Sequence, residues 1–386
     1  MRSGNRREAL NWSAARHRVL YLRYDRIGDM VLATGIIKAI ALAQPTVKVD
    51  VLASVGNAAV LRGNPHVDAI IRIDKKRPWS YLTAILRMRR RRYDAVIDPM
   101  VWGPSLTSML LMWASRAHHR IGIGGRGNDS AFTVLVNRIH EAVHYIDQSA
   151  AMLAAFGVDT TAWGIWRPEL FLTAAELREG EARWHSADAL VQQRQAVRHR
   201  LVVNVSASSP GRYWPDDRFT ATLCRIRSRF PDLSILIIGS PQDAARMARI
   251  GRGAGVAVTH MPHYRQMMAV VATSDFVFTP DTSVTHIASA FGKPAVVMFV
   301  GGGGSYYGPY GTAGRIVSTD GPSLDSVDVG TVIQALGAAL AAWKSSGNSG
   351  ANELEVAARG HPGSFQDGHI VSRGNQSRHS AGKNDR

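Results

Sequence analysis

Residues 279–294 have the sequence Thr-Pro-Asp-Thr-Ser-Val-Thr-His-Ile-Ala-Ser-Ala-Phe-Gly-Lys-Pro and lie between two strand-like apolar runs. Thr282 and Ser283 are good N-cap residues, so we expect a helix to begin there. Gly292 is typical of the position that ends a helix, and Pro294 prevents the helix from resuming. This stretch therefore predicts a strand–helix–strand unit, the repeating element of a parallel sheet covered by helices.

The first turn of such a helix points out of the carboxyl end of the sheet. Its free N–H groups and the positive end of its dipole favour an anion such as phosphate. His286 lies one turn further on, on the same helix face as Thr282. On spacing alone, an ordinary capped helix with a buried histidine is the simpler interpretation.

A second unit near the N-terminus has the same form. Residues 19–24 are typical of a buried strand, and residues 30–44 carry apolar side chains at helical spacing. The loop between them ends at Asp29, which we expect at a helix N-terminus beside the carboxyl end of the first strand. Ligand sites of open parallel sheets lie at that end. The alternative is that Asp29 only caps the helix.

Four segments, in the same order along the chain, resemble the signatures of glycosyltransferase family 9, the ADP-heptose:lipopolysaccharide heptosyltransferases. The segments are Arg23-Tyr-Asp-Arg-Ile-Gly-Asp29, Gly63-Asn-Pro-His-Val-Asp68, Arg212-Tyr-Trp-Pro215, and Asp281-Thr-Ser283 to His286 with Gly292-Lys-Pro294. The resemblance implies an α/β fold of GT-B architecture, in which two Rossmann-like parallel-sheet domains face a cleft.

The resemblance also implies roles for particular residues. Sugar transfer requires a base that takes the proton of the acceptor hydroxyl, and Asp29 matches that position. The departing diphosphate requires hydrogen-bond donors and positive charge, which Arg212, Thr282, Ser283 and His286 would supply. Without the resemblance, Arg212 could be an ordinary surface arginine in a turn.

Three further residues are candidates for contact with the donor sugar or ribose: Asp281, Gln242 and Asp243. Asp281 could instead cap its helix or hold the loop. Gln242 and Asp243 follow an expected strand, where most residues only begin a helix.

The chain departs from the family pattern at three places. Ser283 stands where the family usually has glycine, and Arg212 stands where it usually has lysine. Four glycines, 301–304, follow the last core strand of the expected site, and such a run predicts a mobile lid. These departures leave the chemistry intact but make a sugar related to heptose an alternative to heptose itself.

Strands and helices alternate along both halves of the chain, which predicts two parallel sheets covered on both faces. The expected strands are 19–24, 47–53, 67–73, 93–98 and 118–123, then 201–207, 234–240, 256–260, 275–279, 294–300 and 314–318. The expected helices are 30–44, 79–92, 103–115 and 143–157, then 216–230, 241–251, 264–273, 283–291 and 326–343.

This pattern divides the chain into five parts. We expect a flexible arm over 1–16, an acceptor-binding domain over 17–173, a polar, helix-like linker over 174–199, a nucleotide-sugar-binding domain over 200–344 and a disordered tail over 345–386. The tail has few large apolar residues and cannot bury enough surface to order itself.

The composition also indicates in which cell compartment the protein resides. The 386 residues include one cysteine, Cys224, and no apolar run near the ~18 residues that a membrane span requires. Residues 1–18 lack the apolar segment of a secretory signal. We therefore expect a cytoplasmic protein without an intrachain disulfide.

The formal net charge is +16, and residues 72–92 carry much of it. Their basic side chains, against the single acid Asp74, are Arg72, Lys75, Lys76, Arg77, Arg87, Arg89, Arg90, Arg91 and Arg92. Leu82, Ile85 and Leu86 add an apolar side. A basic amphipathic helix suits an anionic glycolipid or membrane surface, which would place the protein peripherally on the inner membrane. The alternatives are a solvated helix face and a nucleic acid, although no groove-reading element is evident.

The sequence contains no metal or cofactor motif: no Asp-x-Asp after a strand, no zinc spacing and no P-loop. We expect an inverting, metal-independent transferase that moves a heptose or related sugar from an ADP-sugar to an anionic envelope glycolipid. One alternative is a GT-B transferase that uses another nucleotide sugar. Another is a non-catalytic protein that binds anionic membranes, although such a protein needs no carboxylate at Asp29.

Overall fold

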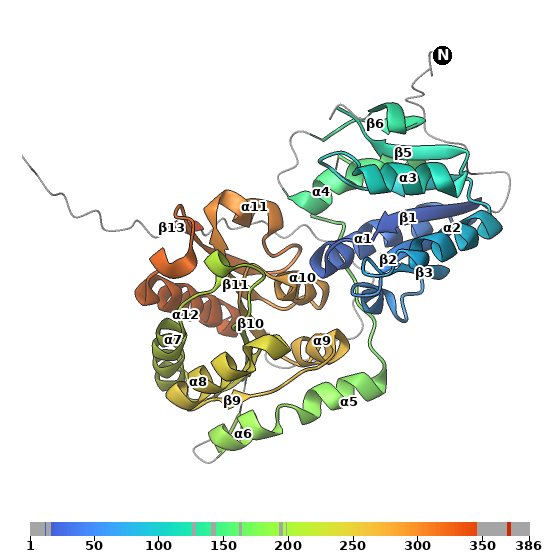
Figure 1. Ribbon diagram of the computed structural model, residues 1–386. Coiled ribbons are helices and arrows are strands. Elements are labelled where there is room, and N and C mark those ends of the chain that lie inside the picture. The colour runs from blue at the N-terminus through green and yellow to red at the C-terminus, as the bar shows by residue number, and fades with distance from the viewer. Residues whose placement is uncertain are drawn as a thin grey trace, which may run out of the picture.

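Short runs of buried aliphatic residues form two parallel sheets, one in each half of the chain (Figure 1). The computed structural model describes residues 12, 17–125, 129–139, 144–161, 164–192, 196–197, 199–345 and 369–371. Among these residues, no helix has the length and apolar character needed to cross a bilayer.

The N-terminal sheet has the strand order β3-β2-β1-β4-β5-β6. Its strands are β1 His17–Arg23, β2 Val47–Ser54, β3 Ala69–Ile73, β4 Ala95–Asp98, β5 His119–Ile123 and β6 Val134–Val136. The order reverses between β1 and β4, and doubly wound folds bind ligands beside the carboxyl ends of strands at such a reversal.

Alternate residues of β1 contact opposite layers of helices, as the pleat of a strand requires. Leu20 and Leu22 pack with α2 Trp79–Arg91 and α3 Leu106–Ser115 on one face. Val19 and Tyr21 pack on the other face. The helical elements there are α1 Ile27–Ala43, α4 Tyr145–Ala150 and η3 Ala151–Phe156. Two 3₁₀ turns, η1 Ala58–Leu61 and η2 Asp129–Ala131, lie in the connections.

The C-terminal sheet repeats this winding with the order β13-β12-β11-β10-β7-β8-β9. Its strands are β7 His199–Asn204, β8 Leu233–Ile238, β9 Ala257–Val258, β10 Phe276–Pro280, β11 Ala295–Val300, β12 Gly314–Thr319 and β13 His369–Val371. The reversal lies between β7 and β10. Each sheet therefore has its own reversal point in strand order.

The helices of this half also form two layers. One core cluster joins the outer face of the sheet to α7 Asp216–Arg229, α8 Ala244–Ala254 and α12 Val329–Ser345. On the other face, α9 Tyr264–Ala272 and α10 Ser283–Ala290 share a core cluster with α1 of the N-terminal half. Helices α1 and α10 are in contact (Figure 1). The short elements are η4 Pro210–Arg212, η5 Pro241–Asp243, η6 Gly301–Gly303, α11 Gly304–Tyr307 and η7 Leu324–Ser326.

The stretch expected to be a linker, 174–199, begins with two packed helices, α5 Ala174–Ala182 and α6 His185–Gln192. Thr173 and Glu176 form a capping box at the start of α5. The buried Arg265 of α9 binds Glu176 at 2.6 Å and donates to the Phe171 carbonyl at 2.8 Å. This segment is therefore fixed against the C-terminal half and does not act as a free spacer.

The structure differs from the sequence expectations at a few further points. α1 begins at Ile27, earlier than expected, and β6 was not expected. Within the arm expected over 1–16 only residue 12 is described: Trp12 is buried and donates to the Ala155 carbonyl at 3.0 Å. Of the expected tail, residue 345 ends α12 and His369–Val371 pairs with β12, while the remainder lies outside the described residues.

Candidate functional site

The N-termini of α1 and α10 meet between the two sheets. A Cβ atom placed on Gly28 would lie 2.7 Å from Cδ2 of His286 and 3.6 Å from Cα of Ser283. Real Cβ contacts are essentially never that short, so any side chain at residue 28 would force the His286 ring or the helices to shift. Two segments that lie about 250 residues apart in the sequence are thus brought into one site.

Asp29 lies in the first turn of α1, and its side chain is 16% exposed. The N-cap residue is Arg26, whose side chain makes no capping bond. The interpretation of Asp29 as only an N-cap is therefore wrong. Its carboxylate instead forms an ion pair with Arg23 at 3.3 Å.

Arg23 ends β1 and is buried, although no sequence pattern marked it for a role of its own. Its guanidinium also lies 3.3 Å from Asp25 and 5.4 Å from the centre of the Tyr145 ring. Burial raises the pKa of Asp25, and the neighbouring Arg23 charge opposes that rise. Arg23 thus holds two carboxylates in a site where unpaired charges would be costly.

The start of α10 is fixed by hydrogen bonds at the carboxyl end of its sheet. Thr282 is the N-cap, and its hydroxyl accepts from the Val284 N–H at 3.3 Å. Asn204, at the end of β7, donates to the hydroxyls of Thr279 at 3.0 Å and Thr282 at 3.1 Å. Ser283 is the first helical residue, so the predicted helix start is confirmed.

Asp281 and Arg212 form an ion pair at 2.9 Å beside this helix start. Burial raises the pKa of Asp281, the charges of Arg212 and Arg26 lower it, and the charge of Asp29 raises it. Charges from both halves of the chain therefore act on Asp281. The structure places Asp29, Arg26, Asp281 and Arg212 in one electrostatic group.

His286 is 5% exposed, and burial lowers its pKa to about 4, so its ring is neutral near pH 7. Within the described part of the chain, its Nδ1 has no hydrogen-bond partner. A neutral imidazole carries one N–H and one acceptor nitrogen. His286 can therefore donate one hydrogen bond, but it adds no positive charge.

Two tyrosines complete the site from a segment that the sequence predicted to be a mobile lid. The glycine run folds as η6 and α11, which carries Tyr306 and Tyr307. The Tyr307 ring stacks on Tyr145 at 5.5 Å and lies 6.4 Å from the His286 ring. Burial, with a smaller effect of the Asp29 charge, raises the pKa of Tyr307 to about 12. The sequence pattern did not mark these two tyrosines, because glycine dominates the segment.

Gln242 and Asp243 lie in η5, before α8. The Asp243 carboxylate accepts hydrogen bonds from Ser240 Oγ at 2.7 Å and the Tyr213 hydroxyl at 3.3 Å, and Gln242 is exposed. The contacts of Asp243 hold this turn in place, and its side chain makes no capping bond to α8.

The basic residues predicted to face an acceptor or membrane are mostly exposed. The exposed ones are Lys75, Lys76, Arg77, Arg87, Arg89, Arg90 and Arg92. Arg91 differs. Its guanidinium forms an ion pair with Asp68, and its Nη2 donates to Oδ1 of the fully buried Asp50 at 3.0 Å. Arg91 neutralises a buried carboxylate, so its assignment to an outward-facing surface is corrected.

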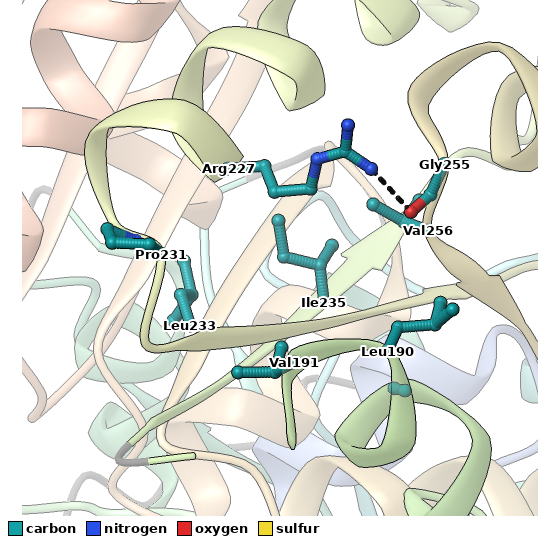
Figure 2. Close-up of a pocket in the computed structure, with 9 residues that line it drawn as sticks. Leu190, Val191, Arg227, Pro231, Leu233, Ile235, Gly255 and Val256 are labelled. Atoms are coloured by element: carbon teal, nitrogen blue, oxygen red, sulfur yellow. Dashed lines mark hydrogen bonds between the residues drawn. The ribbon is translucent and has the colours of Figure 1, made fainter. Parts of the chain in front are cut away.

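A separate hollow of about 70 Å³ lies between α6, α7 and β8 (Figure 2). Its lining is mostly aliphatic, including Leu190, Val191 and Ile235, and Arg227 donates to the Gly255 carbonyl at 2.7 Å beside it. It offers no paired acid and base. Among the described residues, no group of three or more His, Cys, Asp or Glu side chains could hold a metal ion.

Two facing Rossmann-like units, with a carboxylate of one opposite a capped helix start of the other, define a glycosyltransferase of GT-B architecture. The model of glycosyltransferase family 9 (heptosyltransferase) matches residues 83–334, and the chain belongs to this family.

Known relatives agree with this assignment. Lipopolysaccharide heptosyltransferase 3 of Escherichia coli (strain K12) is 22% identical over 290 residues, 72% of this chain and 80% of that protein. Lipopolysaccharide core heptosyltransferase OpsX of Haemophilus influenzae is 19% identical over 301 residues, covering 76% and 80% of the two chains.

Solved structures show the same fold. A glycosyl transferase family 9 protein from Veillonella parvula has a TM-score of 0.72 at 17% identity, covering 85% of this chain and 98% of its own. Escherichia coli heptosyltransferase WaaC with ADP-2-deoxy-2-fluoro heptose has a TM-score of 0.65 at 17% identity, covering 83% and 99%. The fold class expected from the sequence is confirmed.

Proposed function

We propose that this protein transfers a heptose, or a related sugar, from an ADP-sugar to a lipopolysaccharide-type acceptor with inversion at the anomeric carbon. The observation that carries the proposal is the contact of Gly28 with His286 and Ser283, which sets Asp29 opposite the start of α10. The names of the relatives, which include lipopolysaccharide heptosyltransferases, support the choice of substrates.

Asp29 acts as the base in this proposal. Inversion requires one displacement, so the acceptor hydroxyl attacks from the side opposite the departing ADP. A carboxylate is a weak base for an alcohol, and the proton therefore moves late, as bond formation makes the hydroxyl more acidic. The ion pair with Arg23 orients the Asp29 carboxylate. Asp29 lies before the stretch matched by the family model, so its role rests on its position against α10.

The start of α10 holds the donor diphosphate. Its free N–H groups and dipole favour the charge that develops on the leaving ADP, and the hydroxyls of Thr282 and Ser283 lie at the same end. His286 contributes one N–H. Arg212 supplies a bidentate fork if it exchanges Asp281 for phosphate oxygens. These groups supply the stabilisation without a metal ion or another cofactor.

Asp281 then becomes available to the donor sugar or ribose, because its partner Arg212 has moved to the phosphates. Gln242 is exposed beside η5 and is a weaker candidate for the ribose. Asp243 supports the turn through Ser240 and Tyr213, so its part in donor binding would be indirect.

The acceptor is an anionic glycolipid of the cell envelope. The exposed basic side chains at the start of α2 and along it provide the complementary charge, and they favour peripheral binding at the cytoplasmic surface of the inner membrane. A transferase that uses another nucleotide sugar is the alternative that Arg212 and Ser283 leave open, since both differ from the usual family residues.

Calorimetry with nucleotides tests the donor proposal. ADP should bind more tightly than UDP, GDP or CMP. Arg212→Ala should weaken ADP binding by roughly 10- to 150-fold, because a charge-assisted hydrogen bond contributes about 1.5–3 kcal/mol. Adenosine binding should change little. Arg252→Ala, which removes an exposed arginine at the end of α8, is the matched control.

Two results would contradict this proposal. Preference for another nucleotide would rule out an ADP-sugar as the donor. Equal losses for ADP, AMP and adenosine in Arg212→Ala would show that Arg212 supports the fold or the base site and does not hold the phosphates.

A further inference from the structure

Helix α3 presents an uncharged apolar face to solvent. Leu106, Leu110 and Trp113 are 72%, 58% and 73% exposed. Their spacing of four and three residues places them on one side of the helix. The opposite side, with Leu111 and Met112, is buried against the sheet. A surface helix normally carries charged side chains on its outer face, so this face needs an explanation.

Helix α2 presents a second row of exposed apolar side chains beside that of α3. Trp79, Leu82 and Leu86 are 78%, 50% and 47% exposed, at spacings of three and four residues. The two helices are in contact and cover the same face of the N-terminal sheet (Figure 1). Arg89 of α2 donates to the Ala114 carbonyl at the end of α3 at 3.1 Å. The two stripes therefore face the same side of the molecule.

Positive charge surrounds these stripes. Exposed basic side chains lie before α2, along its last turns and after α3: Lys75, Lys76, Arg77, Arg87, Arg90 and Arg116. Apolar area edged by basic groups is complementary to a bilayer with anionic lipid, because phosphates meet the charges while the apolar side chains enter the acyl boundary. Exposed tryptophans suit that boundary in particular.

We propose that the outer faces of α2 and α3 form one bilayer-docking surface, in which the stripes Trp79-Leu82-Leu86 and Leu106-Leu110-Trp113 insert into an anionic membrane. The arginines alone would give an electrostatic attachment that salt weakens. The apolar stripes add an attachment that salt does not screen. This surface deepens the proposed function by naming the partner that holds the acceptor, and its binding requires no turnover.

The position of the surface fits delivery of a membrane-bound acceptor. Lys75 Nζ lies 5.8 Å from the centre of the Tyr24 ring, and the Tyr24 hydroxyl lies 2.9 Å from Ser108 Oγ in the first turn of α3. The N-termini of α2 and α3 thus lie at the carboxyl edge of the sheet, where α1 and Asp29 begin. A headgroup anchored beside the N-terminal ends of α2 and α3 would lie at the same edge of the sheet as Asp29.

Vesicle co-sedimentation of the full chain tests the proposal, with phosphatidylcholine vesicles containing about 30% phosphatidylglycerol. Leu106→Ser, Leu110→Ser and Trp113→Ser together should lower the partition coefficient at least ~10-fold and leave its salt dependence unchanged. Arg87→Gln with Arg90→Gln should instead make the salt dependence less steep. Leu42→Ser with Leu190→Ser, exposed residues of α1 and α6, is the matched control and should bind like the parent.

A second measurement follows insertion directly. Lipids brominated in the acyl chain should quench the parent's tryptophan fluorescence, and Trp79→Phe with Trp113→Phe should remove most of that quenching. Unchanged partition of the triple serine variant, or parent fluorescence that brominated lipid does not quench, would overturn the proposal. A parent dimer that the triple variant turns into a monomer, without vesicle binding, would assign the surface to a second copy and overturn it too. Calorimetry with ADP on the same samples separates this outcome from failure of the donor proposal.

Discussion

Gly28 determines how closely the two halves of the chain approach at the site. A methyl group at this position would have to displace the His286 ring or separate α1 from α10, since its Cβ would lie 2.7 Å from Cδ2. Gly28→Ala should lower turnover about 10-fold or more, with a loss of about 1–3 kcal/mol in stability from overpacking. ADP affinity should change less than turnover, because the start of α10 itself is intact.

Steady-state kinetics, calorimetry and urea unfolding measure these three effects. Gly302→Ala is the control, since no atom lies within 4 Å of a Cβ there. Parent-like turnover in Gly28→Ala would show that this contact does not set the catalytic geometry.

Single residues of the site were predictable from sequence only where a local pattern marked them. Asp29 and Thr282 lie in the first turn of α1 and at the N-cap of α10, close to the helix starts that the sequence predicted. Arg23 was given no role of its own, because no local pattern shows that it is buried and pairs with Asp29. Tyr307 was missed because its partner Tyr145 is far away in sequence. Arg91 was misassigned for the same reason, since its partner Asp50 belongs to β2.

At the scale of an element, His286 of α10 makes the stability of the fold depend on pH. His286 is neutral in the folded chain with a pKa of about 4, whereas the unfolded chain takes up a proton near the ordinary value of 6.5. The unfolded state therefore binds more protons between these values, and stability should fall as the pH decreases from about 6.5 to about 4. At pH 5 the loss from His286 is roughly 2 kcal/mol.

Urea unfolding midpoints at pH 7 and pH 5 measure this loss. His286→Gln should show a smaller difference between the two pH values than the parent, whereas His260→Gln, an exposed control, should match the parent. Identical pH dependence of His286→Gln and the parent would mean that His286 is not buried in its neutral form.

The strands were the most predictable elements. Buried aliphatic runs such as those of β1, β8 and β11 leave little choice of structure, and their observed bounds differ from the expected ones by one or two residues. The edge strand β6 has three residues, too few to show a pattern. The stretch 174–199 was expected to be a polar, helix-like linker, and it contains α5 and α6, with Thr173 and Glu176 forming a capping box at the start of α5.

At the scale of the whole molecule, each half supplies what the other lacks. The N-terminal half offers a carboxylate held by Arg23, and the C-terminal half offers a helix start with Arg212 beside it. The doubling of the Rossmann-like unit could be predicted from alternating strands and helices. That the two domains face a cleft was implied by the family resemblance, but no local pattern shows that Gly28 lies against His286.

Comparison of Asp29→Asn with the parent tests the central claim, that Asp29 is the base opposite the donor phosphates. The rate of ADP release from ADP-heptose with a core glycolipid acceptor should fall about 100-fold or more, while ADP affinity by calorimetry stays nearly unchanged. Asp25→Asn removes a neighbouring carboxylate that also pairs with Arg23, and it should keep a rate within several-fold of the parent. An Asp29→Asn enzyme that releases ADP at close to the parent rate would contradict the account.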